Sequence, residues 1–222
     1  MNFFGHAALA ASHFSEREPP LAHHLPTLCL GAMLPDFIGM LHLGRPVVHD
    51  AALAAGIAFH HGTDEMFHDL PGFQRLSRQA FSWLLERDMP RGPARAVAHM
   101  GIEMLLDEVM ANDAAAREAY VNALGVPLGR LLSFPNSPDA ERLAGLQEAL
   151  LTRSASQLQP PATLVAERIR RSLAGRPRLA TDDAGQALLG SWVSTTRPLV
   201  TAEAPEVLAM LRARLANFGR AQ

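Results

Sequence analysis

Histidines and carboxylates that could bind a metal ion gather in the first half of the chain, where all ten histidines lie within residues 1–99. His60, Asp64 and His68 are spaced four residues apart, so a helix places them on one face. An imidazole and a carboxylate on one face form a two-point clamp for a divalent ion, although an intrahelical His–Asp hydrogen bond uses the same spacing. We expect a metal site here, with His60 and Asp64 as its best pair.

A second series, His99, Glu103 and Asp107, repeats the four-residue spacing beside apolar residues of the next helical segment. Polar groups beside an apolar stripe point into the molecule and need partners, and a metal ion satisfies several of them together. Asp107 directly follows an apolar run and has the strongest claim. Glu103 and His99 could orient it, act as general base or lie on a solvated face.

Two further residues stand in apolar surroundings, His6 near the start and Asp36 after Pro35. His6 lies near the buried face of the first expected helix, where a histidine is also common without any function. A lone buried carboxylate is costly, so Asp36 should cap a helix after Pro35, pair with a cation or bind a metal ion.

Other catalytic signatures are absent from the sequence. It holds no glycine-rich phosphate loop, no Gly-x-Ser-x-Gly elbow and no Cys-x-x-Cys pair. Cys29, the only cysteine, lies between Leu28 and Leu30, which favours a small buried hydrophobic residue over a nucleophile. The possible chemistry is therefore concentrated in the histidines and carboxylates.

Composition and charge exclude several classes of protein. The formal net charge is −2 and all 20 basic residues are arginine, which gives no reason to expect nucleic-acid binding. The start lacks a basic signal region, and the most apolar segment, 28–43, is interrupted by Pro35, Asp36 and His42. We expect a cytoplasmic protein without a transmembrane segment, and the sequence carries no signal for an oligomeric state.

Helical periodicity runs through the whole chain and is interrupted only by Pro- and Gly-rich breaks, so the fold class expected is all-α. We predict a single helical-bundle domain over 1–222, with the metal site in 1–110 and a scaffold or partner surface in 137–222. The expected helices are 2–14, 25–43, 48–69, 72–88, 93–124, 137–158, 161–175, 181–197 and 203–219.

Five short blocks of sequence occur in the order of a known family. They are Met1-Asn2-Phe3-Phe4-Gly5-His6, Gly31-Ala32-Met33-Leu34-Pro35-Asp36-Phe37, Ala55-Gly56-Ile57-Ala58-Phe59-His60 with Asp64 and Leu70-Pro71, Leu105-Leu106-Asp107, and Arg176-Pro177-Arg178-Leu179. On these blocks the chain resembles the acyl carrier protein phosphodiesterase family, also called acyl carrier protein hydrolase.

The resemblance implies an all-helical, distorted relative of the HD phosphohydrolases that removes 4′-phosphopantetheine from the serine of holo acyl carrier protein. It implies a divalent metal ion, typically manganese, and a mixed histidine and carboxylate set also suits iron or magnesium. Glu103 or His61 could transfer the proton, and Asp64 would belong to the catalytic set as well. The metal ligands carried over are His6, Asp36, His60, Asp64 and Asp107.

Two departures from the family pattern keep alternatives open. Ala58 stands where the family has the first histidine of a pair, and His61-Gly62 replaces a basic pair that would suit an acidic carrier protein. One alternative is an HD-like phosphohydrolase that acts on a small phosphoester, such as a nucleotide or a phospholipid headgroup. Another is a non-catalytic helical binding module with a degraded site.

Overall fold

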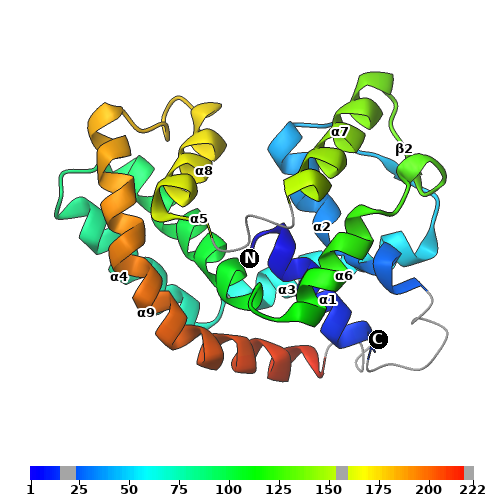
Figure 1. The fold of residues 1–222 in the computed structure, drawn as a ribbon, viewed down its shortest axis with the longest axis horizontal. Helices are drawn as coiled ribbons and strands as arrows, with labels where there is room; N and C mark the ends of the chain where they lie inside the picture. Colours follow the sequence, from blue (N-terminus) through cyan, green and yellow to red (C-terminus); the bar gives the residue numbers. More distant parts are fainter. Residues whose placement is uncertain (16–23, 154–159, 218–222) are drawn as a thin grey trace. The chain divides into compact units, whose positions relative to one another are not determined.

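The computed structural model describes residues 1–15, 24–153 and 160–217, and helices dominate them (Figure 1). This confirms the all-α prediction. A 3-10 turn (Leu128–Arg130) and two short antiparallel strands, β1 (Val47–Val48) and β2 (Leu132–Ser133), are the other elements described, with Val47 opposite Ser133. The helices are α1 (Phe3–Ser15), α2 (Leu25–Leu41), α3 (Ala51–His68), α4 (Pro71–Leu85), α5 (Arg91–Met110), α6 (Ala114–Leu124), α7 (Ser137–Arg153), α8 (Ala162–Ala174) and α9 (Asp183–Leu215).

The chain divides into two compact units, each built from segments that are far apart in the sequence. Unit 1 comprises Met1, Met66–Val109 and Gln159–Ala213, and unit 2 comprises Asn2–Glu65, Met110–Leu158 and Arg214–Gln222. Most of α4, α5, α8 and α9 belongs to unit 1, and α1, α2, α6, α7 and most of α3 belong to unit 2. The expected single domain over 1–222 stays a prediction.

In unit 2, two glycines allow α2 and α3 to touch through their backbones. A Cβ atom added to Gly31 would lie 2.9 Å from Cα of Gly56, and one added to Gly56 would lie 2.8 Å from Cα of Gly31. No side chain fits between the helices at this point, so glycine is required for close approach. Asp36 on α2 and His60 on α3 lie about one turn beyond the contact, which brings these polar residues near each other.

Aromatic residues join α1 to α2 and α6 within the same unit. The ring of Phe3 lies 5.4 Å from that of Phe37, and the ring of Phe4 lies 5.1 Å from that of Tyr120, measured between centroids. All four rings come from expected helices. Aromatic pairs of this kind stabilise a fold beyond the contribution of their buried apolar area. They anchor α1, the helix that carries His6.

Unit 1 packs around Trp192 of α9, whose side chain is fully buried. A Cβ atom on Gly101 of α5 would overlap the Trp192 ring and lie 3.3 Å from Cδ1 of Ile169 on α8. Arg197 of α9 binds Glu108 of α5 through two hydrogen bonds of 3.0 and 3.3 Å. These contacts fix α5, the helix that carries His99 and Glu103.

The expected single helix over 93–124 is wrong, because α5 ends at Met110 and α6 begins at Ala114. Asp113 caps α6 by accepting a hydrogen bond of 2.9 Å from the backbone N–H of Ala115. Arg117 donates to the carbonyl of Ala111 at 2.7 Å, which satisfies a backbone group at the end of α5. The cap and this arginine make a turn more stable than a continuous helix.

The expected break between 181–197 and 203–219 is also wrong, because α9 runs through Pro198 and Pro205. Each proline removes one backbone hydrogen bond, a cost that tertiary packing can outweigh. Buried residues continue every three or four positions across both prolines, so one face of the helix is packed along its length. They include Leu189, Val193, Val200, Ala204, Val207, Leu211 and Leu215.

The remaining expected helices agree with the structure to within about three residues, the usual uncertainty of helix ends. Residues 154–158 and 218–219 of two expected helices lie outside the described residues. Asp182 accepts a hydrogen bond of 2.8 Å from the N–H of Gly185 at the start of α9. Within the described part of the chain, no helix combines the length and apolar character that crossing a bilayer requires.

Candidate metal centre

His60 is held by a backbone carbonyl from the neighbouring helix. It lies on α3 with 6% of its surface exposed, and its Nδ1 atom donates a hydrogen bond of 2.8 Å to the carbonyl oxygen of Ala32 on α2. The proton on Nδ1 leaves the lone pair of the neutral ring on Nε2. A backbone acceptor on one nitrogen is the usual arrangement for a histidine that binds metal through the other.

Burial favours the same neutral form. It lowers the pKa of His60, although the Ala32 carbonyl and the charge of Asp64 act in the opposite direction. An uncharged imidazole is the form that binds a metal ion. His60 is therefore kept in its ligand form near neutral pH.

His6 is held in the same tautomer by Thr63. Nδ1 of His6 lies 3.0 Å from Oγ1 of Thr63, which is 2.9 Å from the carbonyl oxygens of both Phe59 and His60. The single hydroxyl proton is donated to these α3 carbonyls, so Oγ1 accepts from His6 and the His6 proton lies on Nδ1. The lone pair of His6 is thus also on Nε2.

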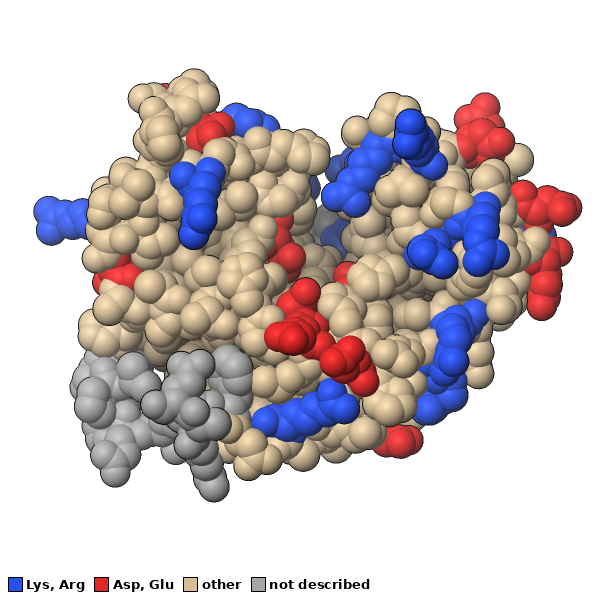
Figure 2. Space-filling view, turned by 180° about the vertical axis from the view of Figure 1, so that it is seen from behind, with Lys and Arg blue, Asp and Glu red and all other residues tan. Residues whose placement is uncertain are grey.

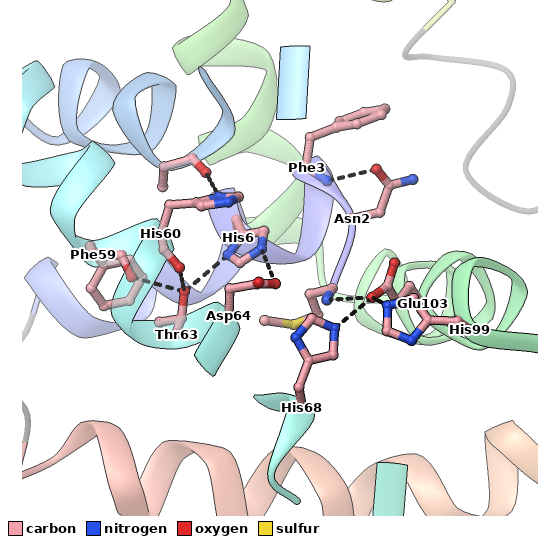
Figure 3. Close-up of polar contacts among 12 residues, drawn as sticks. Asn2, Phe3, His6, Phe59, His60, Thr63, Asp64, His68, His99 and Glu103 are labelled. Carbon is pink, nitrogen blue, oxygen red and sulfur yellow. Dashed lines mark hydrogen bonds and ion pairs between the residues drawn. The ribbon is translucent and has the colours of Figure 1, made fainter. Parts of the chain in front are cut away.

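His6, Asp36 and His60 come together in unit 2. Each offers one possible ligand atom, and the three atoms lie within 4.8 Å of one another. The rings of His6 and His60 lie side by side (Figure 3), and their centroids are 4.0 Å apart. Ligand atoms around one ion lie about 3 Å apart when the bonds are about 2.1 Å, so small side-chain movements would close this set on an ion.

The chemistry of these donors fits a transition ion. Two imidazole nitrogens and one carboxylate suit manganese or iron, and magnesium, which prefers oxygen ligands, stays the other expected ion. Asp36 is half-buried and lies within α2, so the expected alternative of a helix cap after Pro35 is wrong. Pairing with a cation and metal binding both stay predictions for Asp36.

Asp64 and His61 lie at the border of this set. Oδ1 of Asp64 lies 3.8 Å from Nε2 of His6, and its side chain is 40% exposed. His61 is exposed, and its ring meets that of His60 edge-on at 5.4 Å. Both could contact a substrate or a water molecule, and their catalytic roles stay predictions.

His68 does not join His60 and Asp64, because it meets His99 and Glu103 in unit 1. Nε2 of His68 lies 3.0 Å from Oε1 of Glu103, and Nε2 of His99 lies 3.2 Å from the same oxygen (Figure 3). The Met1 ammonium lies 3.3 Å from it as well. His99 and Glu103 of the second series thus form a cluster with His68, and Asp107 is not one of its three members.

The surroundings of Glu103 keep it ionised. Burial would raise its pKa, but the Met1 ammonium and hydrogen bonds from His68 and His99 hold it well below the ordinary value. A carboxylate with a lowered pKa is a weak general base near neutral pH. These contacts suit a cation ligand better than the proton transfer expected for Glu103.

Asp107, the fifth expected ligand, lies on α5 in unit 1 and is 8% exposed. The other four expected ligands belong to unit 2, where the three closest form the cluster described above. Membership of Asp107 in the metal site stays a prediction.

Sequence patterns did not reveal two groups that position the histidines, Thr63 and the Ala32 carbonyl. A weak signal for Thr63 exists, because a threonine inside a helix often donates to the carbonyl four residues earlier. The Ala32 carbonyl carries no side-chain signal.

Comparison with protein-family models, curated proteins and solved structures gives no match for this chain.

Proposed function

We propose that the protein is a metal-dependent phosphodiester hydrolase in which His6, Asp36 and His60 hold a divalent ion. The observation that carries the proposal is the pair of buried histidines, both with the proton on Nδ1, that meet Asp36 within 4.8 Å. A satisfied structural histidine needs no second imidazole and carboxylate beside it. A shared metal ion would explain why both histidines keep the lone pair on Nε2 and why Asp36 lies beside them.

The ion would supply Lewis-acid polarisation of a phosphoryl oxygen and a lowered pKa for the attacking water. Asp64 is the residue to which we assign the orientation of that water, and the position of its partly exposed carboxylate 3.8 Å from Nε2 of His6 supports the assignment. His61, also exposed beside His60, is the proposed proton carrier. Ala32 and Thr63 hold the imidazoles in place.

The proposed substrate is holo acyl carrier protein, in which a phosphodiester joins the 4′-phosphopantetheine arm to a serine. This choice rests on the family resemblance of the five sequence blocks. We expect manganese as the ion, with iron as the alternative that the same ligands suit. Such a reaction would take place in the cytoplasm, where we expect the protein to act.

The test is mass spectrometry of holo acyl carrier protein incubated with the purified protein and Mn²⁺, with EDTA in a parallel sample. We expect loss of the arm only with the metal ion, and no loss with His60→Gln or Asp36→Asn. His49→Gln serves as the matched control, because His49 is exposed and contacts Ser133 at 2.9 Å, away from the three ligands. Unchanged turnover by both site variants would overturn the assignment.

A small phosphoester is the second candidate substrate, and the replacement of the family's basic pair by His61-Gly62 favours it. Figure 2 shows arginines at separate places on the face in view with acidic side chains among them, and no continuous basic patch among the residues described there. An acidic carrier protein is steered by such a patch, whereas a small substrate does not need one. Metal-dependent hydrolysis of bis-p-nitrophenyl phosphate, with the carrier left intact, would select this candidate.

A further inference from the structure

We propose that His68, His99 and Glu103 form a second divalent-metal site, in unit 1, that takes a first-row transition ion such as Zn²⁺ or Fe²⁺. The three offer ligand atoms within 4.8 Å of one another. All three belong to unit 1, so the proposal is independent of the ion held by unit 2.

The distances from the Glu103 carboxylate to both imidazoles already match those between ligands of one ion. Nε2 of His68 and Nε2 of His99 lie 3.0 and 3.2 Å from Oε1 of Glu103. Donor atoms bound to one ion at about 2.1 Å lie about 3 Å apart. Binding therefore requires little movement of the carboxylate toward either ring.

The two imidazoles are held by packing. Their rings stack with centroids 4.8 Å apart and planes inclined by 19°. Phe73 presents its ring to both, with centroids 5.3 Å from His68 and 5.5 Å from His99. Phe73 is itself buried, so it forms a fixed wall beside the rings. Fixed ligands bind an ion at a smaller entropic cost.

Two of the three ligands lie on one helix and the third comes from another. His99 and Glu103 are four residues apart on α5, so they lie on one face of that helix. His68 is the last residue of α3 and approaches the same carboxylate from another element. Two ligands from one helix and a third from elsewhere are a common way to hold an ion at a fixed point.

The cluster is accessible to an ion and to water. The His99 side chain is 50% exposed and that of His68 is 31% exposed, whereas Glu103 is 13% exposed. An ion with three protein ligands keeps further coordination positions for water or another small molecule. Two imidazoles with one carboxylate favour iron or zinc over calcium and magnesium, which prefer oxygen ligands.

The competing explanation is a network of ion pairs with no metal, in which both histidines and the Met1 ammonium share the Glu103 carboxylate. In such a network each histidine donates from Nε2 to the carboxylate, with its ring either neutral or protonated, and exposed pairs of this kind contribute little to stability. The two explanations differ in the amount of metal that the folded protein retains.

The experiment measures bound Zn²⁺ by elemental analysis after the full-length protein is loaded and dialysed against metal-free buffer. Relative to the wild type, His99→Gln and His68→Gln should each lose one equivalent. Asp36→Asn should keep that equivalent and His49→Gln should lose none. Equal Zn²⁺ content in the wild type, His99→Gln and His68→Gln would overturn the proposal and leave the ion-pair network.

Thermal unfolding with and without Zn²⁺ gives a second readout and checks that each variant is folded. An ion that binds only the folded state raises the unfolding temperature. We expect that rise for the wild type and for Asp36→Asn, with at least part of it lost in His99→Gln. The Asp36→Asn protein distinguishes this site from the proposed function. It lacks a ligand of the ion proposed for unit 2 but keeps His68, His99 and Glu103, so each proposal can fail without the other. A rise of the same size in His99→Gln and in the wild type would contradict the second site.

Discussion

The hydroxyl of Thr63 lies 3.0 Å from Nδ1 of His6, and so joins α3 to α1 through a hydrogen bond inside unit 2. Its own proton is committed to the α3 backbone, because the carbonyl oxygens of Phe59 and His60 lie 2.9 Å away. With that proton directed to a carbonyl oxygen, the hydroxyl accepts from Nδ1 of His6. One threonine thus decides which nitrogen of a distant histidine can bind an ion.

Replacement of Thr63 by valine should weaken metal binding without removing any ligand. Valine has a similar shape but cannot accept the His6 proton, so the ring loses its fixed tautomer and orientation. Groups that support metal ligands in this way typically contribute 10–100-fold to affinity or activity, and we expect about that loss of Mn²⁺ affinity. Calorimetric titration with Mn²⁺ measures it.

Thr63→Ser keeps the hydroxyl and should retain most of the affinity. Thr195→Val is the matched control, since Thr195 makes the same type of bond to the carbonyl of Ser191, at 3.0 Å, on the exposed surface of α9. Equal affinities for Thr63→Val and Thr195→Val would show that the hydroxyl does not set the tautomer.

Replacement of Gly56 by alanine should destabilise unit 2 and disturb the site. The new Cβ atom would lie 2.8 Å from Cα of Gly31, so α2 and α3 must move apart. Overpacking of this kind costs about 1–3 kcal/mol in the free energy of unfolding. The same movement would separate Asp36 from His60, so metal affinity should fall together with stability. Chemical denaturation and Mn²⁺ titration test both effects.

Gly145→Ala is the control for that substitution. Gly145 lies inside α7, and apart from its chain neighbours and the backbone of its own helix nothing lies within 4 Å of a Cβ placed there. Alanine at an open helical position should stabilise the protein by about 0.5–1 kcal/mol. A stabilising effect of both substitutions would contradict the backbone contact between α2 and α3.

Helix content could be predicted from the sequence, because periodicity reports which residues face a core. The break after Met110 was missed although Asp113 is a strong cap, because the apolar pattern alone continues past it. At Pro198 a helix break was expected that the structure does not have, because tertiary packing outweighs the local cost of a proline inside α9. Buried residues such as Val193 and Val200 keep their helical spacing across that proline.

The candidate site could be predicted only in its residue types. Spacing on one helix linked His60 to His68, yet the structure places His68 with His99 and Glu103. The partners of His60 come from α1 and α2, and that arrangement depends on a contact between two glycine backbones. Periodicity does not report which glycines meet. Apolar surroundings singled out His6 and Asp36, and the family resemblance grouped them with His60, which spacing alone could not do.

Cys29 should be unreactive in the folded protein. Its side chain is fully buried, and burial raises the pKa of the thiol to about 12. The thiolate is the reactive form, so Ellman's reagent at pH 8 should modify the thiol only after unfolding in guanidinium chloride. The denatured protein serves as the positive control with one thiol per chain. Rapid reaction of the native protein would show that the core around α2 opens readily.

The contacts of Glu103 predict a loss of stability in acid. Because its pKa in the folded protein lies below the ordinary value of 4.5, the carboxylate stabilises the fold above pH 4.5. That contribution disappears as the pH falls from 4.5 through the lower folded value. In metal-free buffer, Glu103→Gln should cost roughly 1.5–3 kcal/mol at pH 7, the range for hydrogen bonds to charged groups, and progressively less below pH 4.5. Urea denaturation over a pH series measures the difference, with exposed Glu206→Gln on α9 as the control. A difference between wild type and Glu103→Gln that does not change with pH would show that the ionised carboxylate does not stabilise unit 1.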